Sequence, residues 1–425
     1  LARHARELAG HHPVAARQRA HRLLDRLGEN EDILRTFNRA TQAVGAVRRI
    51  TPAAEWLLDN FYLIEEQIQL ARRHLPRGYS RELPQLRTGP SAGLPRVYDI
   101  GLELIAHVDA QIDAGALSAF VAAYQSVSAL KLGELWAMPI MLRLGLIENL
   151  QRITTRLTRA RADSDLADQW VDRLQAMAER QPAHLVIVVA DLARADLPST
   201  SAFVAEFCLR LSRHSPVLHL ARHWLEQHLA AQGLTIEQLV QQESQHQAAD
   251  QVSVSHSIAS LRFLSALDWK EFVETLSRVE AVLRGDPADV YGRMDFPTRD
   301  RYRHAVEALA RHSRLTEDEV AREAVTLAAA AAVQQGRDHR AAHVGYHLIG
   351  RGADQLARLA QVHWPWRAAL ERAIRRRPLA CYAGGILLLT LVVGGGFAHL
   401  LRLCHLPAGW TVALGVAGLL GASQL

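Results

Sequence analysis

The sequence contains few residues of the kinds that usually mark a particular chemistry. Only two of its 49 basic residues are lysines, Lys131 and Lys270, so arginine carries the positive charge. Its three cysteines, Cys208, Cys381 and Cys404, lie far apart, which excludes a disulfide framework or a cysteine zinc motif. A formal net charge of +5 over 425 residues is too small to indicate nucleic-acid binding.

Strand patterns and enzyme motifs are scarce as well. The one β-branched run, residues 186–189, is flanked by helix-like sequence and is predicted to belong to a buried helix. The sequence has no Walker loop, no dinucleotide-binding glycine pattern and no nucleophile elbow. The residues alone therefore predict an architecture but no reaction, and no catalytic residue is assigned.

Helical signals, in contrast, recur along most of the chain. Thr51 precedes Pro52, as an N-cap residue precedes a proline at the first helical position. Thr235 and Gln238 fit a capping box. The spacing of apolar residues predicts further helices over 131–160, 199–212, 217–231, 269–283, 300–312 and 317–334.

The predicted fold class is therefore all-α, a multi-helix array followed by a transmembrane helical hairpin. Residues 1–50 are expected to form N-terminal helices, and residues 51–377 an all-α domain that divides into two units near 162–198. Residues 378–425 are expected to form the two membrane helices. Short connections are predicted at 162–166, 196–198, 213–216, 285–287 and 335–338.

Two helical segments combine apolar and polar stripes. Residues 54–68 carry an apolar face and, on another face, the stripe Glu55, Asp59, Tyr62 and Glu66. With Trp56 and Trp136, this stripe is one candidate for a carbohydrate groove with paired carboxylates. Residues 131–150 form an apolar helix that Pro139 should kink. Its polar residues, which predict either a buried structural network or a ligand-lined groove, are Glu134, Arg143, Glu148 and Asn149.

A long proline- and glycine-rich connection spans residues 76–96 and cannot be helical. Such loops are uncommon in compact domains and often functional. Its arginines suit an anion or sugar phosphate, or they form a clamp that pairs with the acidic stripe at 55–66. The candidate ligand residues are Arg77, Tyr79, Arg81 and Arg96, together with Glu55 and Asp59.

Two apparent metal motifs have simpler interpretations. His339, His343 and His347 are spaced to share one helix face, but no acidic or cysteine partner accompanies them, so a polar surface is favoured. Residues 163–165 read Asp-Ser-Asp, like the metal motif of nucleotide-sugar transferases. Here they are expected at a helix start, where Asp and Ser are common. No metal ligand or cofactor is assigned to this chain.

Two apolar runs close the sequence. Residues 379–401 contain no Asp, Glu, Lys or Arg and are long enough to span a bilayer. Only Arg402 follows this run, whereas a group of arginines precedes it, which predicts that residues 1–377 are cytosolic. The second run starts at Leu406 and continues to Leu425, and the chain opens on Leu1, so we expect a part of a larger membrane protein. A buried hairpin in a soluble protein is the alternative. The arginines that precede the first apolar run are Arg367, Arg372, Arg375, Arg376 and Arg377.

Several long motifs show a family resemblance. They include AEWLLDNFYLIEEQI at 54–68, GPSAGLPRVYDI at 89–100, GELWAMPIMLRLGLIENL at 133–150, DWKEFVETLSRVEAVLR at 268–284 and MDFPTRDRYRHAVE at 294–307. Over most of residues 50–350 the chain resembles the N-terminal region of the cyclic β-1,2-glucan synthases, which are large bacterial inner-membrane proteins.

The resemblance implies a glucosyltransferase that polymerises glucose from UDP-glucose with a divalent metal and cyclises the product. Its transferase and phosphorylase-like modules are expected beyond residue 425. The partners implied are those modules, the lipid bilayer and β-1,2-glucan, without nucleic acid. This region is then expected to be a helical scaffold or regulatory domain without catalytic residues of its own. The alternatives are a carbohydrate-active helical groove and a nucleotide or anion sensor that uses the 76–96 loop.

Overall fold

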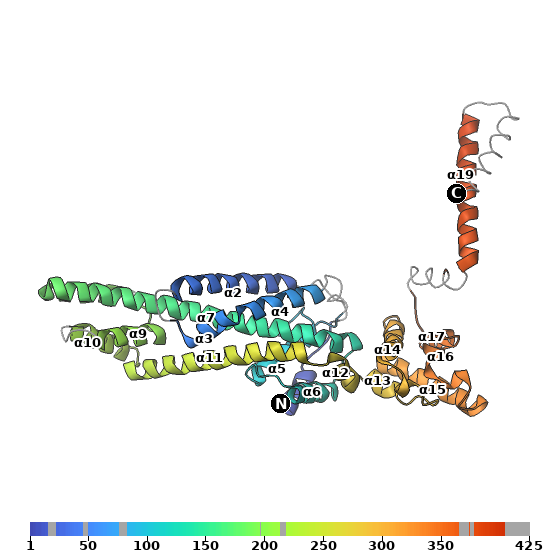
Figure 1. The fold of residues 1–425 in the computed structure, drawn as a ribbon, viewed down its shortest axis with the longest axis horizontal. Coiled ribbons are helices and arrows are strands. Elements are labelled where there is room, and N and C mark those ends of the chain that lie inside the picture. The colour runs from blue at the N-terminus through green and yellow to red at the C-terminus, as the bar shows by residue number, and fades with distance from the viewer. Residues whose placement is uncertain are drawn as a thin grey trace. The chain divides into compact units, whose positions relative to one another are not determined.

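A computed structural model describes residues 1–15, 23–45, 50–75, 83–195, 197–212, 218–364, 374 and 378–403. Within these ranges the regular structure is helical, and extended backbone pairs only in two isolated bridges, Val14–Leu86 and Gln85–Pro95. The predicted all-α class is confirmed. The chain divides into two compact units (Figure 1), called unit 1 (Leu1–Ala281) and unit 2 (Val282–Leu425).

Unit 1 is built around two long helices, α7 and α11, which lie against each other while the shorter helices pack on them (Figure 1). Its helices are α1 (Ala2–Gly10), α2 (Leu23–Gly45), α3 (Pro52–Asp59), α4 (Phe61–His74), α5 (Arg96–His107), α6 (Ala114–Gln125), α7 (Leu132–Arg180), α8 (Leu185–Arg194), α9 (Ser201–Ser212), α10 (His219–Ala230), α11 (Ile236–Ala266) and α12 (Trp269–Leu276). The helix α13 (Arg278–Leu283) crosses the boundary between the units.

The start signals in the sequence act as predicted. The Thr51 hydroxyl accepts a hydrogen bond from the Ala54 N–H at the start of α3. Thr235 and Gln238 exchange the two hydrogen bonds of a capping box at the start of α11. Residues 186–189 lie in α8, as expected from their helical flanks. These signals are local, and this is why the sequence alone could place them.

The connection predicted at 162–166 is wrong, because α7 continues without a break through this segment. It also continues through Pro139. The hydrophobic core does divide here: one cluster along α7 ends at Leu157, and a second begins at Ala167 and includes α8, α9 and α10. The helix α7 therefore connects two hydrophobic clusters within unit 1.

Unit 2 packs short helices around α15. Its elements are the single-turn helices η4 (Tyr291–Arg293) and η5 (Arg340–Ala342) and the helices α14 (Phe296–Ala310), α15 (Glu317–Gln335), α16 (Val344–Leu348), α17 (Ala353–Leu359) and α19 (Pro378–Leu403). The helix α15 ends at Gly336, whose φ of 90° is a conformation that glycine adopts without steric cost. The connections predicted at 285–287 and 335–338 are confirmed.

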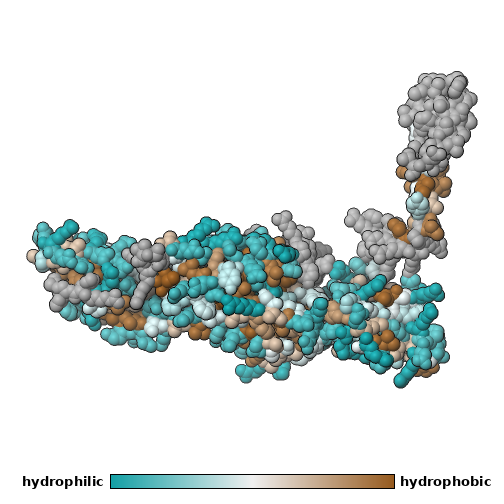
Figure 2. Space-filling view, in the orientation of Figure 1, coloured by the Kyte–Doolittle hydropathy of each residue, from teal (hydrophilic) through white to brown (hydrophobic). Residues whose placement is uncertain are grey.

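The first apolar run forms α19, and apolar side chains described on it, such as Leu379, Leu387 and Leu391, are exposed (Figure 2). Among the residues that the structure describes, no helix combines the length and the apolar character needed to cross a membrane. The predicted transmembrane hairpin is thus not confirmed, and its second run, from Leu406 to Leu425, lies outside the described residues.

Candidate functional site

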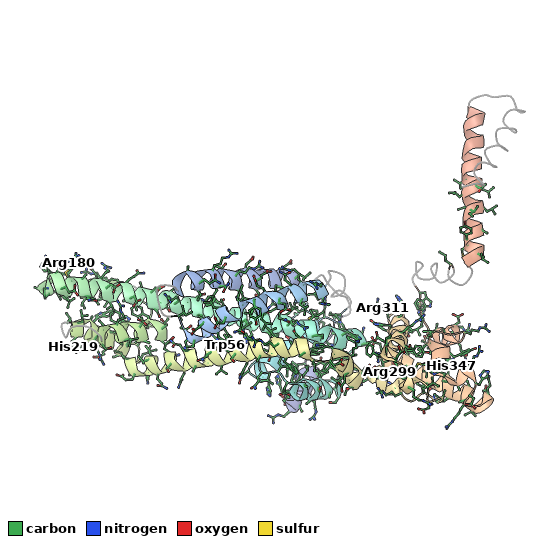
Figure 3. The ribbon with its side chains drawn as sticks, in the orientation of Figure 1. Trp56, Arg180, His219, Arg299, Arg311 and His347 are labelled. Carbon is green, nitrogen blue, oxygen red and sulfur yellow. The ribbon has the colours of Figure 1, made fainter. Side chains whose placement is uncertain are left out.

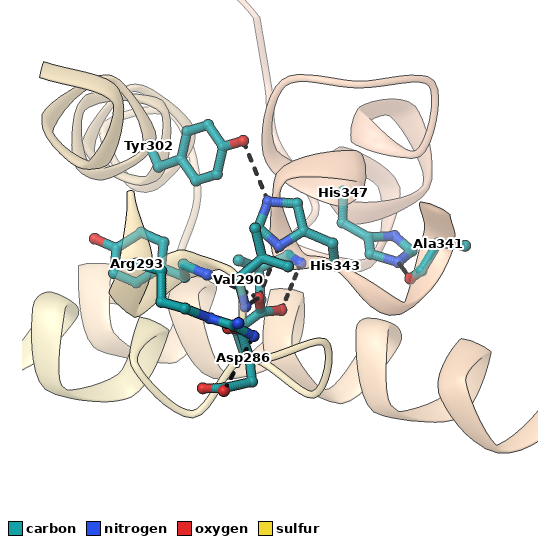
Figure 4. A network of polar contacts seen from close by, with 10 residues as sticks. Asp286, Val290, Arg293, Tyr302, Ala341, His343 and His347 are labelled. Carbon is teal, nitrogen blue, oxygen red and sulfur yellow. Dashed lines mark hydrogen bonds and ion pairs between the residues drawn. The ribbon is translucent and has the colours of Figure 1, made fainter. Parts of the chain in front are cut away.

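A polar cluster of unit 2 is centred on the buried carboxylate of Asp286, in the turn after α13 (Figure 4). One carboxylate oxygen accepts from the backbone N–H groups of Val290 and Tyr291, both at 3.1 Å, and from His343 Nδ1 at 2.7 Å. The other oxygen accepts from the Val344 N–H at 3.0 Å. Four donors therefore surround a single carboxylate, which ties the turn to the start of α16.

His343 extends this cluster to Tyr302 on α14 (Figure 4). Because His343 Nδ1–H donates to Asp286, its Nε2 is the acceptor for the Tyr302 hydroxyl at 3.3 Å. Burial opposes the ionisation of Asp286, but the hydrogen bonds from His343, Val344 and Tyr291 outweigh it and lower the Asp286 pKa. Burial, and next the charge of Asp286, raise the Tyr302 pKa. Asp286 is thus favoured as a carboxylate, and Tyr302 as a protonated phenol.

The cluster is closely packed. A methyl group on Gly345 would lie 2.3 Å from the Tyr302 hydroxyl oxygen and 2.7 Å from His343 Nε2, well inside van der Waals contact. Tyr302 is buried as well. Although Asp, His and Tyr in series resemble a proton relay, this geometry suits an anchor between helices better than a site for a substrate.

The prediction that three histidines share one helix face is wrong. The chain leaves α15 at Gly336, so His339 precedes η5, His343 precedes α16 and only His347 lies within a helix. His339 accepts from the Ala341 N–H, and His347 Nε2 donates to the Ala341 carbonyl at 3.0 Å. Among the described residues, no three His, Cys, Asp or Glu side chains are grouped to hold a metal ion.

In unit 1, Arg96 at the start of α5 forms a buried ion pair with Glu134 of α7. The guanidinium donates in bidentate fashion, with distances of 2.6 and 2.7 Å to the two carboxylate oxygens. The remaining donors reach the Ser128 hydroxyl at 2.9 Å and the Ala129 carbonyl at 2.6 Å. The side chains are 6% and 0% exposed. The pair therefore fixes the end of the proline-rich loop to the central helix.

A second buried chain of hydrogen bonds holds the N-terminal segment to the same loop. His12 lies 3.0 Å from both the Asp99 carboxylate and the Tyr124 hydroxyl, and Ser91 donates to the other Asp99 oxygen. Beside it, the Ala15 N–H donates to the Gln85 carbonyl at 2.8 Å. Residues that are distant in sequence thus meet at the base of the loop.

The polar residues of the predicted helix at 131–150 also find partners inside unit 1. Arg143 donates to the Gln67 amide oxygen on α4 at 2.9 Å and to the Leu264 carbonyl on α11 at 3.1 Å. Asn149 donates to Ser257 of α11 at 3.0 Å. Glu148 accepts from Arg26 of α2 and from the Tyr98 hydroxyl. Of the two interpretations of this helix, a structural network describes these contacts.

The predicted ligand residues are described only in part. Arg77, Tyr79 and Arg81 lie outside the described residues, and the described part of the loop, 83–95, is non-helical as expected. Arg96 is buried, and its donors are engaged by Glu134, Ser128 and Ala129, so it is unavailable to an incoming anion. The alternative prediction, that Arg96 pairs with the acidic stripe, is wrong for the same reason.

The remaining candidates, Glu55 and Asp59, lie on the exposed side of α3. No hydrogen bond or ion pair joins them to another described side chain. Whether they bind a ligand stays a prediction.

Asp163 and Asp165 lie inside α7 rather than at a helix start, so that expectation is wrong. Asp163 accepts from the Thr200 hydroxyl at 2.8 Å, and Asp165 accepts from Arg161 Nε at 3.1 Å. With these partners, on a continuous helix, the Asp-Ser-Asp segment does not fit the metal motif of a nucleotide-sugar transferase.

The contact between His12 and Asp99 predicts a pH dependence. Burial opposes ionisation of Asp99, but the hydrogen bonds from His12 and Ser91 outweigh it and lower its pKa below the ordinary 3.8. A group with a lowered folded-state pKa stabilises the fold above its unfolded pKa, and this contribution is lost as the pH falls through the folded pKa. The Ala15 amide donates to Gln85, and the Arg87 amide donates to the Pro13 carbonyl at 2.9 Å. Hydrogen-exchange protection of these two amides should therefore decrease below about pH 4.

The matched variant is Asp99→Asn, which keeps the size of the side chain but does not titrate. Its protection factors at Ala15 and Arg87 should be lower than in the wild type at neutral pH and nearly constant down to about pH 3. A variant that keeps the wild-type pH dependence would show that another group is responsible.

Comparison with known proteins gives one clear relationship. No family model matches the chain. The chain is 33% identical over 369 residues to the cyclic beta-(1,2)-glucan synthase NdvB of Rhizobium meliloti (strain 1021). The aligned part is 86% of this chain and 13% of that protein. The chain thus spans a small part of its relative's length, and over most of its own length its resemblance to the cyclic β-1,2-glucan synthases is confirmed.

Proposed function

We propose that this chain is a helical scaffold region of a cyclic β-1,2-glucan synthase that polymerises glucose from UDP-glucose. The observation that carries the proposal is the 33% identity to NdvB across 86% of the chain. An alignment of 369 residues is longer than unit 1 alone, so it includes residues of both units. It supports a common fold with a common task in glucan synthesis.

The scaffold role is supported by how the polar residues are used. Arg96, Glu134 and Arg143 connect helices within unit 1, and Asp286 and His343 connect a turn to two helices within unit 2. Buried ion pairs and hydrogen bonds of this kind specify one arrangement of helices, because a misplaced helix leaves a charge unpaired. A rigid helical body suits the positioning of a growing glucan or of a catalytic module.

Catalysis is proposed to reside in other modules of the full-length synthase. The relative is much longer than this chain, which aligns with only 13% of it. UDP-glucose and its divalent metal would be held there, since the Asp-Ser-Asp segment of this chain is engaged within α7. The rest of the same polypeptide and β-1,2-glucan are then the partners of the scaffold.

We further propose that the apolar helix α19 contacts the bacterial inner membrane, with the preceding residues on the cytosolic side. On α19, Leu387, Leu388, Leu391 and Val392 are all exposed, so apolar side chains face outward on more than one side of the helix. Contact with lipid would remove this apolar surface from water. The arginines that precede α19 fit the cytosolic end of such a segment.

The test of the scaffold role is removal of residues 1–364 from the full-length synthase. Glucose transfer from UDP-glucose, chain elongation and ring closure are then measured separately in membranes, per molecule of synthase. We expect at least one of the three steps to fall by about tenfold or more, as expected when a positioned group is lost. Unchanged rates of all three steps would refute the proposal.

A further inference from the structure

Two large aromatic side chains stand on the outer surface of α3 and α4. Trp56 is 43% exposed and Tyr62 is 65% exposed. Figure 3 labels Trp56 among the helices of unit 1. Aromatic rings are normally buried because they remove a large apolar area from water. Rings that remain exposed on regular helices are therefore candidates for contact with a ligand.

The helices beneath these rings are firmly held. The opposite side of α3 buries Leu57, and that of α4 buries Ile64 and Ile68, all in the same hydrophobic core. Asn60 is the single residue between the two helices. Its side chain donates to the Trp56 carbonyl at 2.9 Å and accepts from Arg262 of α11 at 2.6 Å. The two rings are thus presented on a fixed backbone, so little conformational entropy would be lost on binding.

Acidic side chains accompany the rings. Glu55 and Asp59 lie one helical turn apart on α3, and Glu66 lies one turn after Tyr62 on α4; all three are exposed. Among the described residues, none of the three has an ion-pair or hydrogen-bond partner. Their neighbour Glu65 differs, because it accepts from Arg35 at 3.1 Å. The surface therefore offers apolar rings next to unoccupied acceptor oxygens.

This combination selects a class of ligand. A glucan presents apolar C–H faces that stack on aromatic rings, and hydroxyl groups that donate to carboxylates. A nucleotide sugar or another phosphate carries negative charge, which the three exposed acidic side chains would repel. We propose that Trp56 and Tyr62, with Glu55, Asp59 and Glu66, form a binding surface for a neutral β-1,2-linked glucan chain. This inference rests on the proposed function, which supplies the identity of the glucan.

The experiment is calorimetric titration of the full chain with linear β-1,2-linked gluco-oligosaccharides, compared with UDP-glucose. We expect binding of the oligosaccharide and none of UDP-glucose at the same concentration. Tyr62→Ala and Trp56→Ala should each weaken binding by about tenfold, because one stacking ring is lost in each. Tyr62→Phe, which keeps the ring, should retain most of the affinity.

Ile187→Ala on α8 is the matched control, since Ile187 is 54% exposed and belongs to a distant part of unit 1. It should leave binding unchanged. Absence of heat at millimolar oligosaccharide, equal weakening by the control, or preference for UDP-glucose would each overturn the inference. If the surface does not bind but removal of residues 1–364 still impairs synthesis, only this inference fails. If removal has no effect, the proposed function fails.

Discussion

Replacing Arg96 by methionine is expected to lower the free energy of unfolding of unit 1 by about 3–5 kcal/mol, the cost of leaving one charge of a buried pair without its partner. Glu134 is fully buried, and Arg96 provides its bidentate contact. The Lys131 backbone N–H, at 2.9 Å, would remain as a donor to Glu134 but cannot neutralise its charge. Urea unfolding, followed by hydrogen exchange within residues 96–150, measures the loss.

Two further variants distinguish the loss of stability caused by an unpaired buried charge from the loss caused by removing any arginine. Arg194→Met removes an exposed arginine that lies 3.5 Å from Asp191, and should change stability by less than about 1 kcal/mol. The double variant Arg96→Met, Glu134→Leu should recover part of the lost stability, because no charge is then buried alone. If Arg96→Met were no more destabilising than Arg194→Met, the ion pair would not be the anchor described above.

Asp286→Asn should destabilise unit 2 by about 2–4 kcal/mol, since buried donors would be left without an acceptor. The carboxylate accepts from three backbone N–H groups and from His343. In either orientation, the amide NH2 of asparagine would face at least one of these donors. Hydrogen exchange at the Val344 and Tyr291 amides is the most direct measurement.

The control for this variant is Asp289→Asn in the same turn. Asp289 is exposed, and its carboxylate forms a surface ion pair with Arg293 at 3.2 Å. Asparagine tolerates the φ of 52° at this position, so stability should change by less than about 0.5 kcal/mol. Equal effects of the two substitutions would contradict the anchoring role of Asp286.

Local signals were enough to predict most helices but not the contacts between them. Thr51 and Thr235 cap the helices that follow them, because capping depends on residues two or three positions away. In contrast, His343 and Asp286 are 57 positions apart, and Arg143 and Gln67 are 76 apart. Only tertiary packing brings such pairs together, so no periodicity in the sequence identifies them.

The incorrect predictions have more than one cause. The Asp-Ser-Asp segment resembled a helix start, but Thr200 and Arg161 satisfy its carboxylates from within the fold, and α7 continues. The three histidines had helical spacing, but Gly336 ends α15 before the first of them. For the cluster around Asp286, the isolated His343 was the one available signal, and its partner could not be inferred from spacing.

One measurement tests directly whether the folded helical region is needed for glucose transfer. Glucose transfer from UDP-glucose is measured in membranes, per molecule of full-length synthase, for Arg96→Met and for Arg194→Met. If the helical region serves as a scaffold, transfer should fall with Arg96→Met in proportion to the fraction of unit 1 that is unfolded, and remain at the wild-type level with Arg194→Met. Full transfer by an Arg96→Met synthase whose unit 1 is demonstrably unfolded would contradict the scaffold role.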